Sequence, residues 1–143
     1  MLGDISRRGL VTVRSFDHVS LPMQDAEPMV AFYRALGLDV AESPHLVSVH
    51  LGDQMINFHR SATWQREGFT LRAPAATPPC GDLCFVWDGS PQALHMALEG
   101  TGADVVEGPV PRQGARGVEA LSVYVRDPDG NLLEFMIYPR DSA

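Results

Sequence analysis

The sequence predicts an α+β fold in which two βαβββ modules enclose one shared cleft. The first observation behind this prediction is that the order strand, helix, three strands occurs twice along the 143 residues. The second is spacing, because Gly37 follows His18 by 19 residues and Gly102 follows Asp82 by 20. This period is longer than that of solenoid repeats and indicates two copies of one module.

The first module is predicted to begin with a strand followed by a helix. Residues 16–21 alternate between apolar and polar side chains, so His18 and Ser20 share the polar face of a half-buried strand. A helix follows that Asp25 caps and Gly37 terminates. Its apolar stripe consists of Met29, Val30, Phe32, Tyr33 and Leu36. The remaining strands are expected at residues 38–40, 46–51 and 55–59.

The second module repeats this order after a connection. Residues 60–79 hold three prolines and little periodicity, which is typical of a loop between units. Residues 82–87 predict a strand, and Ser90 and Pro91 cap and open a helix. The apolar stripe of that helix is Leu94, Met96, Ala97 and Leu98. Strands are expected at 104–106, 121–125 and 131–138, a flexible basic loop at 108–117 and a turn at 127–130.

A chain of this length normally forms one domain. Residues 1–14 are interpreted as an N-terminal leader or extra edge segment, and residues 15–143 as the single domain. Its expected parts are module one at 15–60, a connection at 61–79 and module two at 80–139.

Composition excludes several functional classes. The net charge of −7 opposes non-specific binding to nucleic acid or to anionic membranes. No apolar run approaches the roughly 18 residues that span a bilayer, and the N-terminus lacks the apolar region of a signal peptide. Two cysteines are too few for a disulfide framework, so we expect a reduced, cytoplasmic protein. Phosphate-binding glycine loops and the Gly-x-Ser-x-Gly motif are absent from the sequence.

Glu134 is the strongest candidate for chemistry. Its strand is apolar on both faces, and an ionised carboxylate in such a place needs either a partner or a metal ion. An ion pair with one of the 11 basic residues is the alternative, although none lies beside Glu134 on its own strand.

The repeat points to a metal site. His18 alone is compatible with a hydrogen-bonded core residue, and Asp82 alone with a turn residue, but the repeat places them at equivalent positions. We therefore expect His18, Asp82 and Glu134 to converge on the cleft as metal ligands. One histidine with two carboxylates favours Fe(II) or Mn(II) and also admits Ni(II) or Zn(II). Three protein ligands would leave positions open for a substrate.

Two residues on the predicted strand at 55–59 are further candidates. Asn57 is the repeat partner of Glu134 and is a candidate for substrate binding. His59 shares its face, and it either completes a metal shell, carries a proton or binds substrate. We rank His59 above Asn57 as a catalytic residue.

The remaining candidates line the predicted cleft or its rim. Cys84 shares the face of Asp82 and is expected to form part of the wall, since no base that would activate its thiol is evident. Arg112 and Arg116 lie in the predicted basic loop. They either close over an anionic substrate or are merely solvated.

From about Phe16 to Tyr138 the chain resembles the vicinal oxygen chelate superfamily, which includes glyoxalase I, bleomycin-resistance proteins and extradiol dioxygenases. The resemblance is carried by Phe-Asp-His-Val at 16–19, Ala-Phe-Tyr-Arg-Ala-Leu-Gly-Leu at 31–38 and Asp-Pro-Asp-Gly-Asn-Leu-Leu-Glu-Phe at 127–135. More narrowly, Gly-Asp-Gln-Met-Ile-Asn-Phe-His at 52–59 is similar to the group called glyoxalase-domain-containing protein 5.

The resemblance implies a half-open barrel of paired modules, a homodimer and a divalent metal. His18 matches the first-strand histidine of the superfamily and Glu134 its last-strand glutamate. Asp82 stands where metal-binding members usually have a second histidine, and Asn57 where glyoxalase I has a glutamate.

Two functional hypotheses follow. The leading one is a metal-dependent lyase, isomerase or ring-cleaving enzyme that chelates a small substrate through adjacent oxygens. The alternative is a metal-free protein that binds or sequesters a small molecule, as bleomycin-resistance proteins do.

Overall fold

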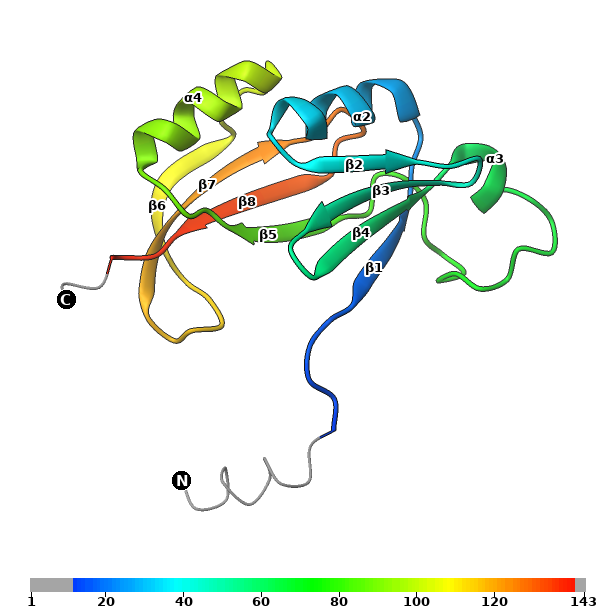
Figure 1. Ribbon diagram of the computed structural model, residues 1–143, viewed down its shortest axis with the longest axis horizontal. Helices are drawn as coiled ribbons and strands as arrows, with labels where there is room; N and C mark the ends of the chain where they lie inside the picture. Colours follow the sequence, from blue (N-terminus) through cyan, green and yellow to red (C-terminus); the bar gives the residue numbers. More distant parts are fainter. Residues whose placement is uncertain (1–11, 141–143) are drawn as a thin grey trace.

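The computed structural model describes residues 12–140 and contains two four-stranded sheets (Figure 1). The first sheet has the order β1-β4-β3-β2, with bounds β1 His18–Pro22, β2 Asp39–Glu42, β3 Leu46–Leu51 and β4 Gln54–His59. The second has the order β5-β8-β7-β6, with bounds β5 Asp82–Val86, β6 Glu107–Gln113, β7 Glu119–Arg126 and β8 Leu132–Ile137. The helices are α2 Ala26–Ala35, α3 Ser61–Trp64 and α4 Pro91–Thr101. The sheets do not close on each other, so the predicted half-open α+β architecture is confirmed.

The two sheets share one register. In each, the first strand pairs in parallel with the last, and His18 lies opposite Met55 as Asp82 lies opposite Leu132. The central rows are Ser20–Asn57–Ser48 in the first sheet and Cys84–Glu134–Tyr124 in the second. The predicted equivalence of Asn57 and Glu134 therefore holds in the backbone pairing.

The helices begin and end close to the predicted residues, with one difference. Ser90 caps α4 by accepting a hydrogen bond from the Ala93 amide at 3.1 Å, and Gly102 ends it with a φ of 78°. Asp25 stands at the N-cap position of α2, but its side chain makes no cap hydrogen bond. Its backbone N–H donates instead to Asp129 Oδ1 at 2.9 Å, so Asp25 joins the two modules.

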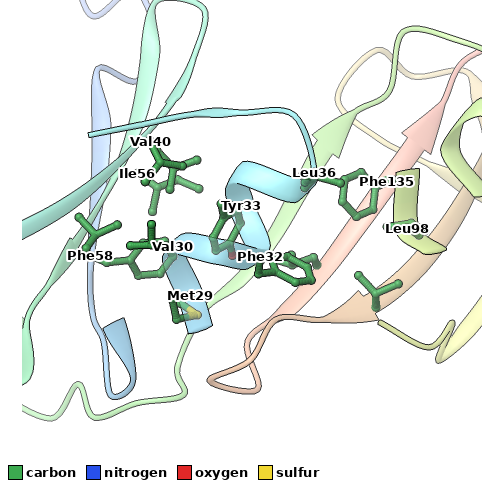
Figure 2. Packing of buried hydrophobic residues seen from close by; sticks show 14 of the residues in the cluster. Met29, Val30, Phe32, Tyr33, Leu36, Val40, Ile56, Phe58, Leu98 and Phe135 are labelled. Carbon is green, nitrogen blue, oxygen red and sulfur yellow. The ribbon is translucent and has the colours of Figure 1, made fainter. Parts of the chain in front are cut away.

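The core is shared by both modules. Side chains of α2 lie between the first sheet and the second module, and Figure 2 shows Phe58, Ile56 and Val40 on one side and Phe135 and Leu98 on the other. Helices α2 and α4 pack against each other on the same side of the molecule (Figure 1). The prediction that Met96 belongs to the apolar stripe of α4 is wrong, because its side chain is 72% exposed.

The second module differs from the prediction at its edge. No strand forms at 104–106, and most of the segment predicted as a flexible loop is the edge strand β6. An edge strand tolerates Pro109 and Pro111 because one of its sides has no strand to pair with. Gly108 has a φ of 111°, and a Cβ there would overlap the backbone of Ser122. Glycine at this position therefore permits the register shift of β6 against β7.

The turn between β7 and β8 fastens the second module to the first. The Asp127 carboxylate accepts hydrogen bonds from the buried Tyr33 hydroxyl at 2.7 Å and from the Asn131 side chain at 2.8 Å. Asp129 accepts from the backbone amides of Gln24 and Asp25. The contacts of Tyr33, Gln24 and Asp25 with this turn join residues that are 94, 105 and 104 positions apart.

Two further predictions concern the ends and connections of the chain. The leader at 1–14 lies mostly outside the described residues, and residues 12–14 form no strand. The connection after β4 contains the short helix α3, which the sequence pattern does not predict. No helix within residues 12–140 is both long and apolar enough to cross a membrane.

Candidate functional site

Glu134 lies at the centre of β8 on the sheet face opposite the core. Its neighbours Leu133 and Phe135 point into the core and are buried, whereas Glu134 itself is half-buried. The Ser122 hydroxyl donates a hydrogen bond of 2.6 Å to its Oε2 atom. Among residues 12–140, no basic side chain forms an ion pair with this carboxylate. The structure thus shows no ion pair of the kind considered as the alternative role for Glu134.

A cavity of about 350 Å³ opens in front of this carboxylate. Its wall includes Tyr124, Met136 and Tyr138, together with Arg112 from β6. Gly114 also lines the cavity. A Cβ at this position would lie less than 3 Å from the Tyr138 hydroxyl and from the Met136 sulfur. The backbone after β6 therefore lies close against this face of the sheet.

Cys84 lies next to Glu134 in the sheet register. Although Cys84 as a whole residue is exposed, partial desolvation of its thiol raises the pKa of that thiol to about 11, and the nearby negative charge of Glu134 adds to the shift. The thiol is therefore protonated at neutral pH, which suits a wall residue better than a nucleophile. Cys80 and Cys84 are both free and exposed, in agreement with the expected absence of a disulfide.

His18 and Asp82 line a second cavity, of about 270 Å³, at the seam where β1 and β4 meet β5. The His18 Nδ1 atom lies 2.7 Å from Asp17 Oδ2, an exposed contact. Cys84 lines this cavity as well as the one before Glu134. The structure therefore brings His18 and Asp82 together and places Glu134 in the adjoining cavity.

The three predicted metal ligands are divided between two cavities within one chain. No group of three or more His, Cys, Asp or Glu side chains suited to hold a metal ion occurs within residues 12–140. The donor types of His18, Asp82 and Glu134 suit a divalent ion. One chain alone does not assemble them.

Asn57 and His59 occupy different surroundings. Asn57 is 8% exposed and accepts a hydrogen bond of 2.7 Å from the Ser48 hydroxyl. His59 lines a third cavity with Arg72 and Trp64. Burial lowers the pKa of His59, and the positive charge of Arg72 lowers it further, so the imidazole is held neutral.

Arg112 and Arg116 each lie over a tyrosine ring. The Arg112 guanidinium donates to Glu107 at 2.9 Å and to the Tyr124 hydroxyl at 3.1 Å. Arg116 lies over Tyr138, 4.3 Å from the ring centroid, a cation–π contact. Arg112 thus lines the Glu134 cavity, whereas Arg116 does not line it and contacts Tyr138, a residue of its wall.

Sequence reasoning missed several residues at these sites. Tyr124 and Ser122 share a face of the strand predicted at 121–125, so the two-residue period could have identified them as neighbours of Glu134. Arg72 had no such signal, because it lies in an aperiodic connection.

Comparison with known proteins gives the family. The family model described as Glyoxalase/Bleomycin resistance protein/Dioxygenase superfamily matches residues 15–135. The glyoxalase domain-containing protein RDO1 of Mycosarcoma maydis is 38% identical over 129 residues, which cover 90% of this chain and 70% of that protein. Metapyrocatechase 2 of Cupriavidus necator is 31% identical over 132 residues, covering 91% of this chain and 35% of that protein.

A solved structure agrees in both fold and sequence. Virulence protein STM3117 of Salmonella typhimurium is 36% identical over 124 residues, covering 85% of this chain and 83% of that protein. Its crystal structure aligns with a TM-score of 0.77 and covers 90% of this chain and all of that one. With its paired βαβββ sheets and matching family model, the chain belongs to the Glyoxalase/Bleomycin resistance protein/Dioxygenase superfamily.

Proposed function

We propose that this protein is a divalent-metal-dependent enzyme that acts on a small molecule presenting two adjacent oxygen atoms. The observation that carries the proposal is the Glu134 carboxylate, which faces a cavity of about 350 Å³ without a basic partner among residues 12–140. A carboxylate that faces a cavity without a basic partner is available to bind a cation or a ligand. Membership of a superfamily that contains lyases and dioxygenases supports catalysis.

His18, Asp82 and Glu134 are the residues proposed to hold the metal. Because they lie in two adjoining cavities of one chain, we propose that the protein is a homodimer in which a second copy completes the site. A divalent ion bound there would act as a Lewis acid towards the substrate oxygens.

The residues around Glu134 favour its proposed role as a metal ligand. The Ser122 hydroxyl occupies Oε2, which leaves Oε1 available to bind or to accept a proton. The protonated Cys84 adds no second negative charge beside it. Arg112 lines the cavity but is paired with Glu107, so Arg116, which lies over the Tyr138 ring of the wall, is the arginine that would favour an anionic substrate. His59 is proposed as a second catalytic residue on the first sheet.

A metal-free binding protein is the second candidate. It is favoured by Asn57, a neutral residue that already has a hydrogen-bond partner at the position equivalent to Glu134. It is also favoured by the lack of a three-donor cluster within residues 12–140. In this case the same cavities would hold a ligand without changing it.

Metal content separates the two candidates. Protein purified without chelator is analysed for metals and titrated with Mn(II), Fe(II), Ni(II) and Zn(II), alongside the variants His18→Ala and Glu134→Gln. We expect near-stoichiometric metal in the wild type and at least about tenfold weaker binding in both variants. Glu119→Gln, which removes an exposed carboxylate of β7, is the matched control and retains metal. Absence of metal binding at micromolar concentration would overturn the metal-dependent enzyme and turn the search to the ligand of the binding-protein candidate.

Mixed dimers test the shared site. If each site takes His18 from one chain and Glu134 from the other, a dimer of one His18→Ala chain and one Glu134→Gln chain has one intact site. If both residues come from the same chain, every site in the mixed dimer is damaged. Recovery of about one metal ion per mixed dimer is the expected result.

A further inference from the structure

A third cavity lies between the first sheet and the connection that follows β4. Its volume is about 90 Å³, several times the roughly 15 Å³ that one water molecule requires. Ser20, His59 and Arg72 are the residues with polar side chains in its wall besides Trp64, and most of the other lining residues, such as Leu21 and Ala76, are apolar. The space fits a compact group of a few atoms better than an aromatic ring.

Arg72 places a fixed positive charge on this cavity. Its guanidinium lies over the Trp64 ring, 5.4 Å from the centroid, and donates to the backbone oxygens of Pro74 and Ala76. Trp64 is itself held by a hydrogen bond of 2.9 Å to the Met23 oxygen. Among residues 12–140, no carboxylate forms an ion pair with Arg72. Its charge is therefore positioned but not neutralised.

The surrounding segment has the opposite charge balance from the whole protein. Residues 60–79 contain three arginines and one glutamate, whereas the complete chain has a net charge of −7. Of these arginines, Arg60 is paired with Glu42 at 3.1 Å, so Arg66 and Arg72 supply the positive charge. Positive charge concentrated in one segment of an acidic protein attracts anions to that place. This favours an anionic occupant over a cation or a neutral group.

His59 adds a neutral polar neighbour. Its Nδ1 atom is buried and has no hydrogen-bond partner, and its ring packs against Phe69 with the centroids 5.1 Å apart. An imidazolium would leave a buried N–H unpaired at Nδ1, so the neutral ring is favoured. The Nε2 atom then remains to donate or accept a hydrogen bond.

We propose that this cavity binds the carboxylate group of a small aliphatic acid, with Arg72 as counter-ion and Ser20 and His59 as hydrogen-bonding neighbours. A carboxylate matches the guanidinium in charge and planar shape. The apolar wall accommodates a short alkyl group. The assignment does not depend on Glu134 or on a metal ion, and it goes beyond the proposed function, with which it shares only His59.

Acetate is the probe for this site. Isotope-labelled protein is titrated with sodium acetate at constant ionic strength, and the signals of the Trp64 indole N–H and the His59 ring are followed by NMR. We expect saturable shifts of both signals. Arg72→Gln should weaken acetate binding at least about tenfold, because a charge-assisted hydrogen-bonded pair is lost. Ala76→Leu should also weaken it by filling the cavity while Arg72 stays in place.

Matched variants distinguish this site from general charge effects. Arg66→Gln removes a neighbouring arginine that lies over Phe69 and should leave acetate affinity unchanged. Glu134→Gln should also leave it unchanged, so failure of the metal proposal and failure of this one are separate results. Unsaturable shifts, equal shifts with chloride, or undiminished binding in both Arg72→Gln and Ala76→Leu would overturn the assignment.

Discussion

The two sheets have the same strand order and register, yet their centres differ in charge. In the first sheet Asn57 is almost fully buried and accepts a hydrogen bond from Ser48. In the second, Glu134 is half-buried and has one hydroxyl donor, Ser122. Two sheets with the same strand order and register can therefore have different chemistry at equivalent positions. One substitution at an equivalent position converts a neutral, internally bonded centre into a charged one that faces a cavity.

The segments attached to the sheets differ as well. The first module continues into the connection that carries Arg72, whereas the second has the strand β6 and the loop that carries Arg116. Both place arginines over aromatic rings, but they do so at different cavities. We infer that the two halves of the protein have separate binding roles.

The largest effect is expected from disrupting the junction that holds the two modules together. Asp127→Ala removes the acceptor for the buried Tyr33 hydroxyl and for the Asn131 side chain. We expect the free energy of unfolding to fall by about 3 kcal/mol, measured by urea denaturation. Tyr33→Phe removes one of these hydrogen bonds and should cost about 1 kcal/mol. A smaller loss for Asp127→Ala than for Tyr33→Phe would contradict the proposed role of the turn.

Substitutions at the two central positions test whether their environments differ. Asn57→Glu places an unpaired carboxylate at a site 8% exposed and should destabilise the fold by about 2 kcal/mol. Glu134→Gln keeps the shape of a half-exposed side chain and should change stability by less than about 1 kcal/mol. Urea denaturation of both variants measures the difference. Equal losses would show that the two positions are equivalent in environment as well as in register.

The smallest expected effect is on the pH dependence of stability. Burial and the Arg72 charge lower the pKa of folded His59 below its ordinary value of 6.5, so the unfolded chain binds a proton more readily than the folded protein. The His59 contribution to stability is therefore complete above about pH 6.5 and is lost as the pH falls towards the folded pKa. In His59→Gln, the decrease in unfolding free energy between pH 7 and 5 should be shallower. A slope unchanged from the wild type would argue against the shift.

The local sequence pattern predicted most of the fold because the features that define strands and helices depend on residues close together in the sequence. The alternation around His18, the cap at Ser90 and the helix end at Gly102 each act within a few residues. The strand β6 escaped prediction because two prolines normally oppose a strand, and only its edge position makes them tolerable. Met96 was misplaced because apolar character alone does not show which side of a helix faces water.

The candidate site was predictable in its residue types but not in its arrangement. Glu134 stands out as the one charge in an apolar strand, and the repeat identified Asp82 as the equivalent of His18. Their division between two adjoining cavities depends on how the sheets pack, which no local pattern encodes. Arg72 was missed for the same reason, since its aromatic partner and its cavity arise from packing of the connection.

The hydrogen bonds from Gln24 and Asp25 to Asp129 have a consequence for synthesis of the chain. All strands of the first sheet have been made once His59 is complete, but the acceptor for these amides follows them by 105 and 104 residues. At about 5–20 residues per second, the 70 residues from His59 to Asp129 take the ribosome about 4–14 s. During that time α2 has no second module to cover the side of it that later meets Leu98 and Phe135. This apolar side of α2 is therefore available to a chaperone that binds nascent chains before the second module has been made.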